Sequence, residues 1–477
     1  MDNLFAVISF NLPSNNNSLN EFKCFSNSLF NNTSSLSTKI SNQDNFIYLT
    51  KYASENSNTD SDIKKEPQRL SEHLKAPIIG KIRIDNKLNI NALCKPILND
   101  GIQFSSPDEE SLFNAYKKLK VKAFKKMKGN FQAIFWDEHS QQLCAVIDAF
   151  SSRSLFYIKQ ADSLYIGSDA KVLAKATNTN LTVNKIAISQ WLAGRPNPDL
   201  SMFNELKRLP AGHCLEFSKE NGIKITKFWD IDPGFSVTYN NTEDYKAHFF
   251  ELLQSSVANR LNATQLSENT AVFCQMSGGM DSTSVTAIAK QLQDKENFAL
   301  HTMSHQYKNT QTCDESTNIK DMISKLGLAH QHYIELDQFE SRSFAQLYPT
   351  DFDNPGVVLS PKYHQELALM KHLGASVLLT GNGGDETCWG HSASYRSRLF
   401  KGEFGVINEV IDACGQLNEP IARSLYKLFM PNSIQNLVKL ARNKPTNTNE
   451  CPPWLTLKAF NFVKEELILS LNHSFID

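Results

Sequence analysis

The sequence of 477 residues lacks several features that would place a protein in a specialised class. Its nine cysteines include no CxxC pair, which argues against a zinc ribbon or a disulfide scaffold and indicates a reducing compartment. No apolar run reaches the roughly 18 residues that a membrane helix requires. The N-terminal MDNLFAVISFN has neither the basic start nor the long apolar core of a signal peptide. We therefore expect a cytoplasmic protein with no integral membrane segment.

The chain also lacks an excess of charge of either sign. Lys and Arg number 49 and Asp and Glu number 50, which gives a formal net charge of -1. A nucleic-acid binder needs a basic field, and this composition provides none. The expected partners are small molecules or peptides, and we expect no nucleic acid among them.

Short apolar runs and polar turns alternate in the N-terminal half. Residues 14–44 differ because about half of them are Asn or Ser, so they bury little apolar surface. We expect surface loop with one weak strand there, and the sequence does not reveal its role. From Pro77 on, β-branched and aromatic runs predict layered antiparallel β-structure with a helical insert at 108–128. The turn-rich residues 231–244 predict a linker between domains at 1–230 and 245–477.

Candidate strands and helices alternate in the C-terminal half. The candidate strands are AVFCQM, FALHTM, HQHYIEL and SVLLTG, and the candidate helices are Ser282–Gln293, Cys313–Leu326 and Pro361–Leu373. This alternation predicts a doubly wound parallel sheet, in which ligands bind at the carboxyl ends of the strands. The expected fold class is therefore α/β, with a layered antiparallel β domain followed by a parallel-sheet domain.

The motif SGGMDS stands where the first of these strands gives way to a helix. Gly278 and Gly279 allow close approach of a ligand, and the helix N-terminus that follows presents N–H groups to an anion. Ser277 and Ser282 add hydroxyl donors, and Asp281 is a candidate ligand for magnesium. The pattern thus predicts a phosphate-binding loop. The alternative is an ordinary strand-to-helix turn rich in Gly and Ser.

A second motif, LLTGNGGDE, follows a later candidate strand. Its glycines, Gly381, Gly383 and Gly384, predict a loop that a ligand can approach closely. Asp385 would bring a second carboxylate to the crevice that holds Asp281, which suits a clamp for magnesium and pyrophosphate. The alternative is a tight turn with solvated acids.

SGGMDS followed by LLTGNGGDE resembles the ATP-pyrophosphatase synthetase domain of the asparagine synthetase family. The resemblance continues in Asp314-Glu315 ahead of KLGLAH, and in the N-terminal half in GNFQAIFWD, LFY and LKRLPAGH before Phe228-Trp229. It spans nearly the whole chain. It implies a glutamine-amidotransferase-like N-terminal domain and an AMP-forming, ATP-dependent carbon–nitrogen ligase that uses Mg²⁺.

Departures from the family pattern narrow this expectation. Glutamine-using members carry a nucleophilic cysteine at position two, where this chain has Asp2, and Cys24 has no evident base beside it. We therefore expect no glutaminase activity and a degenerate N-terminal domain that serves structure or recognition. Asn382 stands where asparagine synthetases have a glutamate and β-lactam or carbapenam synthetases a tyrosine, and an amide is no general base at neutral pH.

Within the family, the chain is most similar to lasso peptide cyclases, which close an isopeptide ring. GKIRIDNK at 80–87 and CPPWL at 451–455 carry this resemblance. It implies a precursor peptide as substrate, with the precursor-binding and leader-protease proteins of the pathway as partners. An ammonia-using or β-lactam-synthetase-like ligase of small molecules stays open, as does a degenerate peptide-binding scaffold. The peptide, its ring size, the acceptor residue and the oligomeric state are not readable.

The resemblance also implies roles for individual residues. A substrate carboxylate would attack the α-phosphate of ATP, and an amine would then attack the acyl-adenylate. Lys444 resembles the late catalytic lysine of the family, although a solvated loop lysine is an equal alternative, and Asn382 is assigned to the same centre. His391, Tyr395 and Arg396 are expected on helix surfaces. The implied ATP contacts are Cys274, Ser277, Gly278, Gly279, Asp281, Ser282, Met303, Thr380 and Gly381, and the implied metal ligands are Asp281 and Asp385.

Overall fold

The computed structural model describes most of the chain, in two units. The described residues are 2–10, 36–41, 45–53, 78–85, 106–137, 140–232, 234–261, 270–295, 298–310, 312, 314–336, 361–375, 377–388, 395, 398–417, 419–430, 434, 438, 455–456, 458–461 and 463. The N-terminal unit comprises Met1–Thr238 with two later segments, Tyr348–Val358 and Leu455–Asp477, and the C-terminal unit comprises Tyr239–Leu347 and Leu359–Trp454. The division after Thr238 falls inside the segment that the sequence predicts as a linker.

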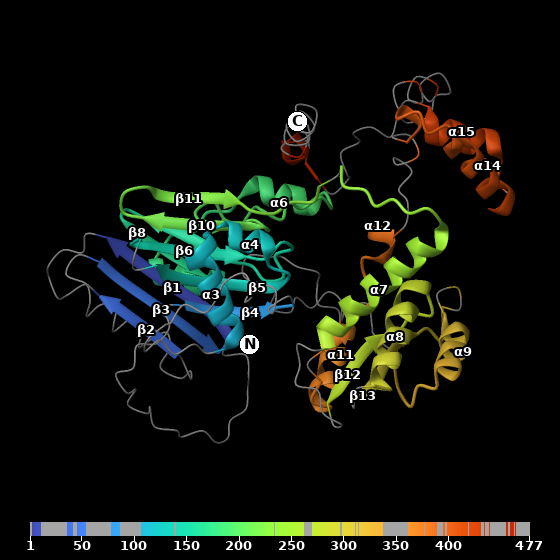
Figure 1. The fold of residues 1–477 in the computed structure, drawn as a ribbon, viewed down its shortest axis with the longest axis horizontal. Helices are drawn as coiled ribbons and strands as arrows, with labels where there is room; N and C mark the ends of the chain where they lie inside the picture. Colours follow the sequence, from blue (N-terminus) through green and yellow to red (C-terminus); the bar gives the residue numbers. More distant parts are fainter. Residues whose placement is uncertain are drawn as a thin grey trace. The chain divides into compact units, whose positions relative to one another are not determined.

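Two antiparallel sheets form the N-terminal unit (Figure 1). The first has the order β2 (Leu36–Ser41), β3 (Asn45–Ala53), β1 (Asp2–Phe10), β8 (Ser163–Gly167), β7 (Phe156–Gln160) and β9 (Lys207–Arg208). The second has the order β11 (Gly222–Lys227), β10 (His213–Ser218), β6 (Gln142–Ile147), β5 (Gly129–Asp137) and β4 (Ile78–Ile84). The helices of this unit are α3 (Pro107–Leu119), α4 (Lys122–Lys126), α5 (Ala170–Thr177) and α6 (Lys185–Leu192).

The apolar side chains of β5 show how these sheets are layered. Ile134 and Trp136 join a cluster with Leu4, Ala6 and Ile8 of β1, so this face of the second sheet packs on the first sheet. The alternate residues Phe131, Ala133 and Phe135 pack instead with residues of α3 and α4. A third cluster joins Val7 of β1 to Ala170 and Leu173 of α5. The order of layers is therefore helix, sheet, sheet, helix, which agrees with the predicted layered β domain.

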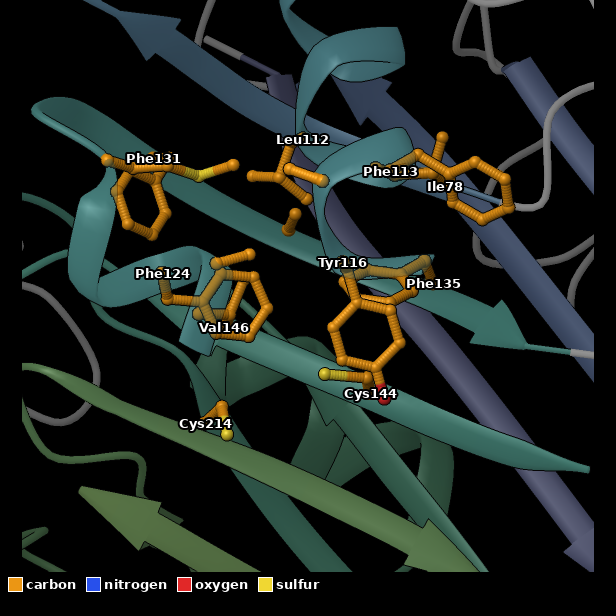
Figure 2. Packing of buried hydrophobic residues seen from close by; sticks show 14 of the residues in the cluster. Ile78, Leu112, Phe113, Tyr116, Phe124, Phe131, Phe135, Cys144, Val146 and Cys214 are labelled. Atoms are coloured by element: carbon orange, nitrogen blue, oxygen red, sulfur yellow. The ribbon is translucent and has the colours of Figure 1, made fainter. Parts of the chain in front are cut away.

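Helix α3 is fixed to its sheet through Tyr116 (Figure 2). Ser106 begins the helix, since its side-chain oxygen accepts a hydrogen bond from the backbone N–H of Glu109 at 3.2 Å. Near the other end the Tyr116 ring lies 4.6 Å from that of Phe135. Its hydroxyl donates to Glu216 of β10 at 3.1 Å, and burial raises the pKa of Tyr116. The predicted helical insert is thus the helical cover of this sheet.

A four-stranded parallel sheet forms the centre of the C-terminal unit. Its order is β14 (His330–Glu335), β13 (Ala299–Gln306), β12 (Ala271–Gln275) and β15 (Val377–Leu379), and each described pairing is parallel. The helices are α7 (Thr242–Leu261), α8 (Met280–Gln293), α9 (Ser316–Leu326), α11 (Pro361–His372), α12 (Gly384–Cys388), α14 (Gly405–Leu417) and α15 (Ile421–Phe429). The predicted α/β fold class is confirmed, and all four predicted strands are present.

Helices cover both faces of this sheet. Val272 and Cys274 of β12 pack with residues of α7, α8 and α9. Phe273, between them in sequence, packs on the other face with Met303, Ile334 and Met370 of α11. Burial on both faces explains why these strands read as continuous apolar runs rather than as alternating patterns. Among the described helices, none combines the length and the apolar character that crossing a membrane would demand.

The structure differs from the sequence expectation at some element ends. Strand β3 was not predicted. Strand β1 is longer than the short apolar run at its centre, because it pairs with β3 along nine residues. Helix α9 begins at Ser316, later than predicted, because Asp314 belongs to the preceding loop. Its carboxylate accepts hydrogen bonds from the Ser316 hydroxyl at 2.7 Å and the Tyr307 N–H at 3.2 Å, and these bonds lower the pKa of Asp314.

Three histidines gather at the beginning of β13 and β14. His301 Nδ1 lies 3.0 Å from His332 Nε2, and the His301 ring stacks 4.5 Å from that of His330. Phe273 stacks on His301 from β12, with ring centroids 5.1 Å apart. Burial and the two neighbouring imidazoles lower the pKa of His301 to about 4.

This cluster predicts that acid destabilises the C-terminal unit. Between the ordinary pKa of 6.5 and the folded value of about 4, the unfolded chain binds a proton at His301 that the folded chain does not. The contribution of neutral His301 to the free energy of unfolding is therefore fully present above pH 6.5. It decreases as the pH is lowered toward 4. The His301→Phe variant should show a smaller loss of Tm across this window. Circular dichroism melts of both proteins at pH 7.5 and pH 4.5 measure it, and equal losses of Tm would contradict the assignment.

Candidate functional site

The loop between β12 and α8 is organised by two serine hydroxyls. The Ser277 N–H donates to the Ser282 hydroxyl oxygen at 3.1 Å, and the two hydroxyl oxygens lie 3.0 Å apart. Gly278 has a φ of +79°, and a Cβ there would lie 3.0 Å from the Cβ of Asn318. A side chain at Gly278 would therefore strain the backbone and crowd α9. The loop delivers the N-terminus of α8, with its N–H groups, to the carboxyl end of the sheet.

The second loop joins β15 to α12 beside the first. Strand β15 pairs with β12 in parallel, with Leu379 opposite Cys274, so both chains leave the sheet at the same edge. Gly383 has a φ of +92°, and its carbonyl accepts a hydrogen bond from the Thr387 hydroxyl at 2.6 Å. Asn382 is exposed at the tip of this turn.

The two loops touch at two glycines, where a Cβ would meet the other loop. A Cβ on Gly381 would lie 2.5 Å from the backbone nitrogen of Ser282. A Cβ on Gly384 would lie 2.3 Å from Oδ2 of Asp281. The Asp281 carboxylate thus lies directly against Gly384, the residue before Asp385. Two segments about a hundred residues apart in sequence therefore meet at one edge of the sheet, as the motif spacing predicts.

The residues present fit a magnesium ion held jointly with phosphate oxygens. Asp281 is half-buried and Asp385 is exposed, and each lies in the first turn of its helix. Among the described residues, no group of three or more His, Cys, Asp or Glu side chains is arranged to hold a metal ion. Magnesium is commonly held by one or two carboxylates, with substrate phosphates and water completing its shell. Two carboxylates beside the loop that the sequence predicts to bind phosphate match that pattern.

Cys274 and Met303 are buried below this edge. Met303 is fully buried, and its carbonyl accepts a hydrogen bond from the Met276 N–H at 2.9 Å. Burial raises the pKa of the Cys274 thiol to about 12, so this thiol stays protonated and is no nucleophile. Because both side chains are buried, a nucleotide at this edge would meet their main-chain atoms.

Two buried hydroxyls near the loops were not predicted. The side-chain oxygens of Thr283, in the first turn of α8, and Ser304, near the end of β13, have no hydrogen-bond partner among the described residues. Ser304 is 1% exposed. Buried polar atoms without partners are rare and concentrate at ligand and water sites. Ser304 gave no distinct signal, because its strand ALHTMSHQ contains several other polar residues.

Several predicted residues cannot be placed. Lys444, His391, Arg396 and Cys24 lie outside the described residues, as does most of CPPWL. Of the remaining predicted residues, Thr380 and Gly381 follow β15 at the touching loops, and Tyr395 is half-buried. The assignment of Lys444 to the reaction stays a prediction.

The fold and the paired loops define a two-unit α/β protein whose second unit carries two touching glycine-rich loops at the carboxyl edge of its sheet. Comparison with known families agrees. A glutamine amidotransferase domain matches residues 86–229, and an asparagine synthase domain matches residues 248–461. The chain belongs to the asparagine synthetase family.

Curated relatives share only part of their length with this chain. Asparagine synthetase [glutamine-hydrolyzing] 3 of Bacillus subtilis is 28% identical over 51% of this chain and 40% of that protein. Asparagine synthetase [glutamine-hydrolyzing] 2 of the same organism is 23% identical over 80% of this chain and 53% of that protein. Amidase chry2 of Gibberella zeae is 23% identical over 63% of this chain and 45% of that protein. The matches thus span about half the length of these relatives or less.

A solved structure of glutamine phosphoribosylpyrophosphate amidotransferase from B. subtilis matches 79% of this chain and 90% of that chain. Its TM-score is 0.30 and its sequence identity 10%, which is too low a likeness to support any argument about this protein.

The contact between Gly384 and Asp281 predicts a sharp effect of adding one methyl group. Gly384→Ala should displace the Asp281 carboxylate and lower the ATP-dependent activity that the resemblance implies by at least about 100-fold, the scale for losing one preorganised electrostatic group. Gly415→Ala in α14 is the matched control, because a Cβ there meets nothing within 4 Å. Exchange of labelled pyrophosphate into ATP measures activity, and circular dichroism checks folding. A folded Gly384→Ala protein with parental exchange would contradict the contact.

Proposed function

We propose that the chain is an ATP-dependent amide-bond-forming ligase that activates a carboxylate by adenylation and passes the acyl group to an amine. The observation that carries the proposal is the contact between the two loops, which sets Asp281 against Gly384 at the end of the strand that leads into the phosphate-binding loop. Membership of the asparagine synthetase family supports it.

The residues at this edge can each take a defined part in adenylation. The N–H groups at the start of α8 and the hydroxyls of Ser277 and Ser282 would hold phosphate oxygens. Asp281 and Asp385 would hold Mg²⁺, which neutralises charge on the leaving pyrophosphate. Asn382 can orient a substrate by donating and accepting hydrogen bonds.

The described part of the N-terminal unit supports an amine source other than glutamine. Its cysteines, Cys144 and Cys214, are both fully buried in the core beneath α3 (Figure 2). Burial raises the pKa of Cys144 well above the ordinary range of a thiol. A buried, protonated thiol cannot attack a glutamine amide. We propose that this unit serves structure or recognition.

The finer proposal is macrolactam formation in a lasso peptide precursor in the cytoplasm. The enzyme would adenylate an Asp or Glu side chain of the peptide, which the peptide N-terminal amine then attacks. A peptide α-amine has a pKa of about 8 and is partly neutral at pH 7, so it needs less help than a more basic amine. This suits a site in which Asn382 is exposed where relatives carry an acid or a phenol. A precursor-binding protein and a leader protease would be its partners.

A second candidate is amide formation on a small molecule with ammonia or an internal amine. The names of the B. subtilis relatives favour it, since both are described as asparagine synthetases. The loop residues described above would serve both reactions equally. The identity of the product therefore separates the two candidates.

Removing either carboxylate charge should abolish adenylation. Asp281→Asn and Asp385→Asn keep the side-chain volume and lose the charge, so pyrophosphate–ATP exchange should fall by about 100-fold or more while the fold is retained. The control is Asp294→Asn, which removes only the surface ion pair with Lys290 at the end of α8. Parental exchange in either test variant would reject the metal clamp.

The product should be a cyclised peptide. Supplied with ATP, the candidate precursor and its protease, the enzyme should release AMP and pyrophosphate and yield a peptide lighter by one water in mass spectrometry. Blocking the peptide N-terminus should prevent this loss. Lys444→Ala should slow ring closure far more than ATP binding. Efficient conversion of aspartate and ammonia to asparagine, with no dehydrated peptide, would reject the cyclase and favour the second candidate.

A further inference from the structure

His305 of β13 and Glu366 of α11 form a hydrogen-bonded pair in the C-terminal unit. His305 Nε2 lies 2.6 Å from Glu366 Oε1. The glutamate side chain is 4% exposed and the histidine side chain 20% exposed. A buried carboxylate is costly unless it is paired, so this bond fixes both side chains in place.

The pair lies at the same edge of the sheet as the two loops. His305 is two residues beyond Met303, whose carbonyl accepts the N–H of Met276 at the end of β12. Helix α11 leads into β15, which runs parallel to β12, so the helix must run back against the strand direction. The helix therefore begins at the carboxyl edge, and Glu366, in its middle, reaches His305 near the carboxyl end of β13. Met370, one turn later, packs lower down on Phe273.

The bond to Glu366 determines which nitrogen of His305 can accept a proton. When the imidazole is neutral, its Nε2–H donates to the carboxylate, which leaves a lone pair on Nδ1. A carboxylate behind an imidazole both orients the ring and stabilises the imidazolium that forms on protonation. The pair therefore has the composition of a general base with its orienting acid.

Amide formation needs such a base, and three other described groups at the strand ends are poorer candidates. Asn382 is an amide. Asp314 is a weak base because hydrogen bonds from Ser316 and Tyr307 lower its pKa. Glu335, at the end of β14, pairs with Lys308. Among the described residues at the carboxyl ends of the four strands, the imidazole of His305 is the candidate base.

We propose that His305 is a catalytic base for the second half-reaction, with Glu366 as its positioning residue; this rests on the proposed ligase function. The amine nitrogen uses its lone pair to form a C–N bond to the carbonyl carbon of the acyl-adenylate, and its proton passes to Nδ1 of His305. The bond between that carbon and the phosphate oxygen breaks, and AMP leaves with the electron pair. The imidazolium then returns its proton to water.

The test separates the two half-reactions in the full-length protein. His305→Gln keeps a donor near Glu366 but removes the base. Pyrophosphate–ATP exchange should stay within about twofold of the parent, while amide formation should fall by about 100-fold, the lower range for losing general base catalysis. The assay uses either the candidate precursor peptide or aspartate with ammonia, whichever supports exchange in the parent.

Hydroxylamine provides a second readout that a structural role would not reproduce. It is largely neutral at pH 7 and attacks acyl-adenylates without a base, so His305→Gln should still form hydroxamate at close to the parental rate. In His305→Ala, added imidazoles should restore amide formation in order of their basicity. Glu366→Gln should lower amide formation by about tenfold, since it keeps a hydrogen bond but loses the charge. Glu335→Gln, at the next strand end, is the matched control and should leave both half-reactions unchanged.

Each outcome has a distinct meaning. Parental amide formation in His305→Gln rejects His305 as the base and leaves the ligase function standing. A raised KM for ATP in the exchange assay, with an equal loss of hydroxamate formation, also rejects His305 as the base. It would show that His305 and Glu366 contribute to nucleotide binding instead. No exchange and no hydroxamate in the parent with any of these substrates rejects the proposed function, and the role of His305 with it.

Discussion

The site depends on a steric constraint between two loops that lie far apart in sequence. Gly381 lies against the backbone of Ser282, and Gly384 lies against the carboxylate of Asp281, with no room for a Cβ at either position. These contacts decide where Asp281 can point and how closely α12 can approach α8. The loop glycines therefore do more than permit tight turns, because their missing side chains create the space in which the acidic residues converge.

The sequence was sufficient to predict the fold class and both loops, because their signals are local. A buried strand, a glycine pair and a helix start are contiguous in SGGMDS, and a parallel sheet brings strand ends together by its topology. Residues that act through distant partners gave no such signal. His305 and Glu366 are 61 positions apart and look like ordinary strand and helix residues. Strand β3 is a different case, because its run NFIYLTKYA is rich in strand-forming residues and could have been predicted.

The N-terminal unit joins a helix to its sheet sandwich through buried polar contacts. Strand β5 is buried on both faces, so the unit retains a double core. Within it, Tyr116 hydrogen-bonds to Glu216, and Lys120 lies 2.5 Å from the buried carboxylate of Asp137. The Tyr116–Glu216 contact binds α3 to the sheet, and the Lys120–Asp137 pair joins the end of that helix to β5. The described cysteines of this unit act as small apolar side chains in the core.

The position of β15 has a consequence for biosynthesis. Among the described strands it lies at one margin of the parallel sheet, it is three residues long, and it is the last of them in sequence. The remaining three strands can form as the chain leaves the ribosome, but the second of the two touching loops has no anchor until β15 docks beside β12. Ribosome-bound nascent chains that end before this strand would thus be folded in part yet lack the contact between Gly384 and Asp281, so the site is completed in one late step of synthesis rather than gradually.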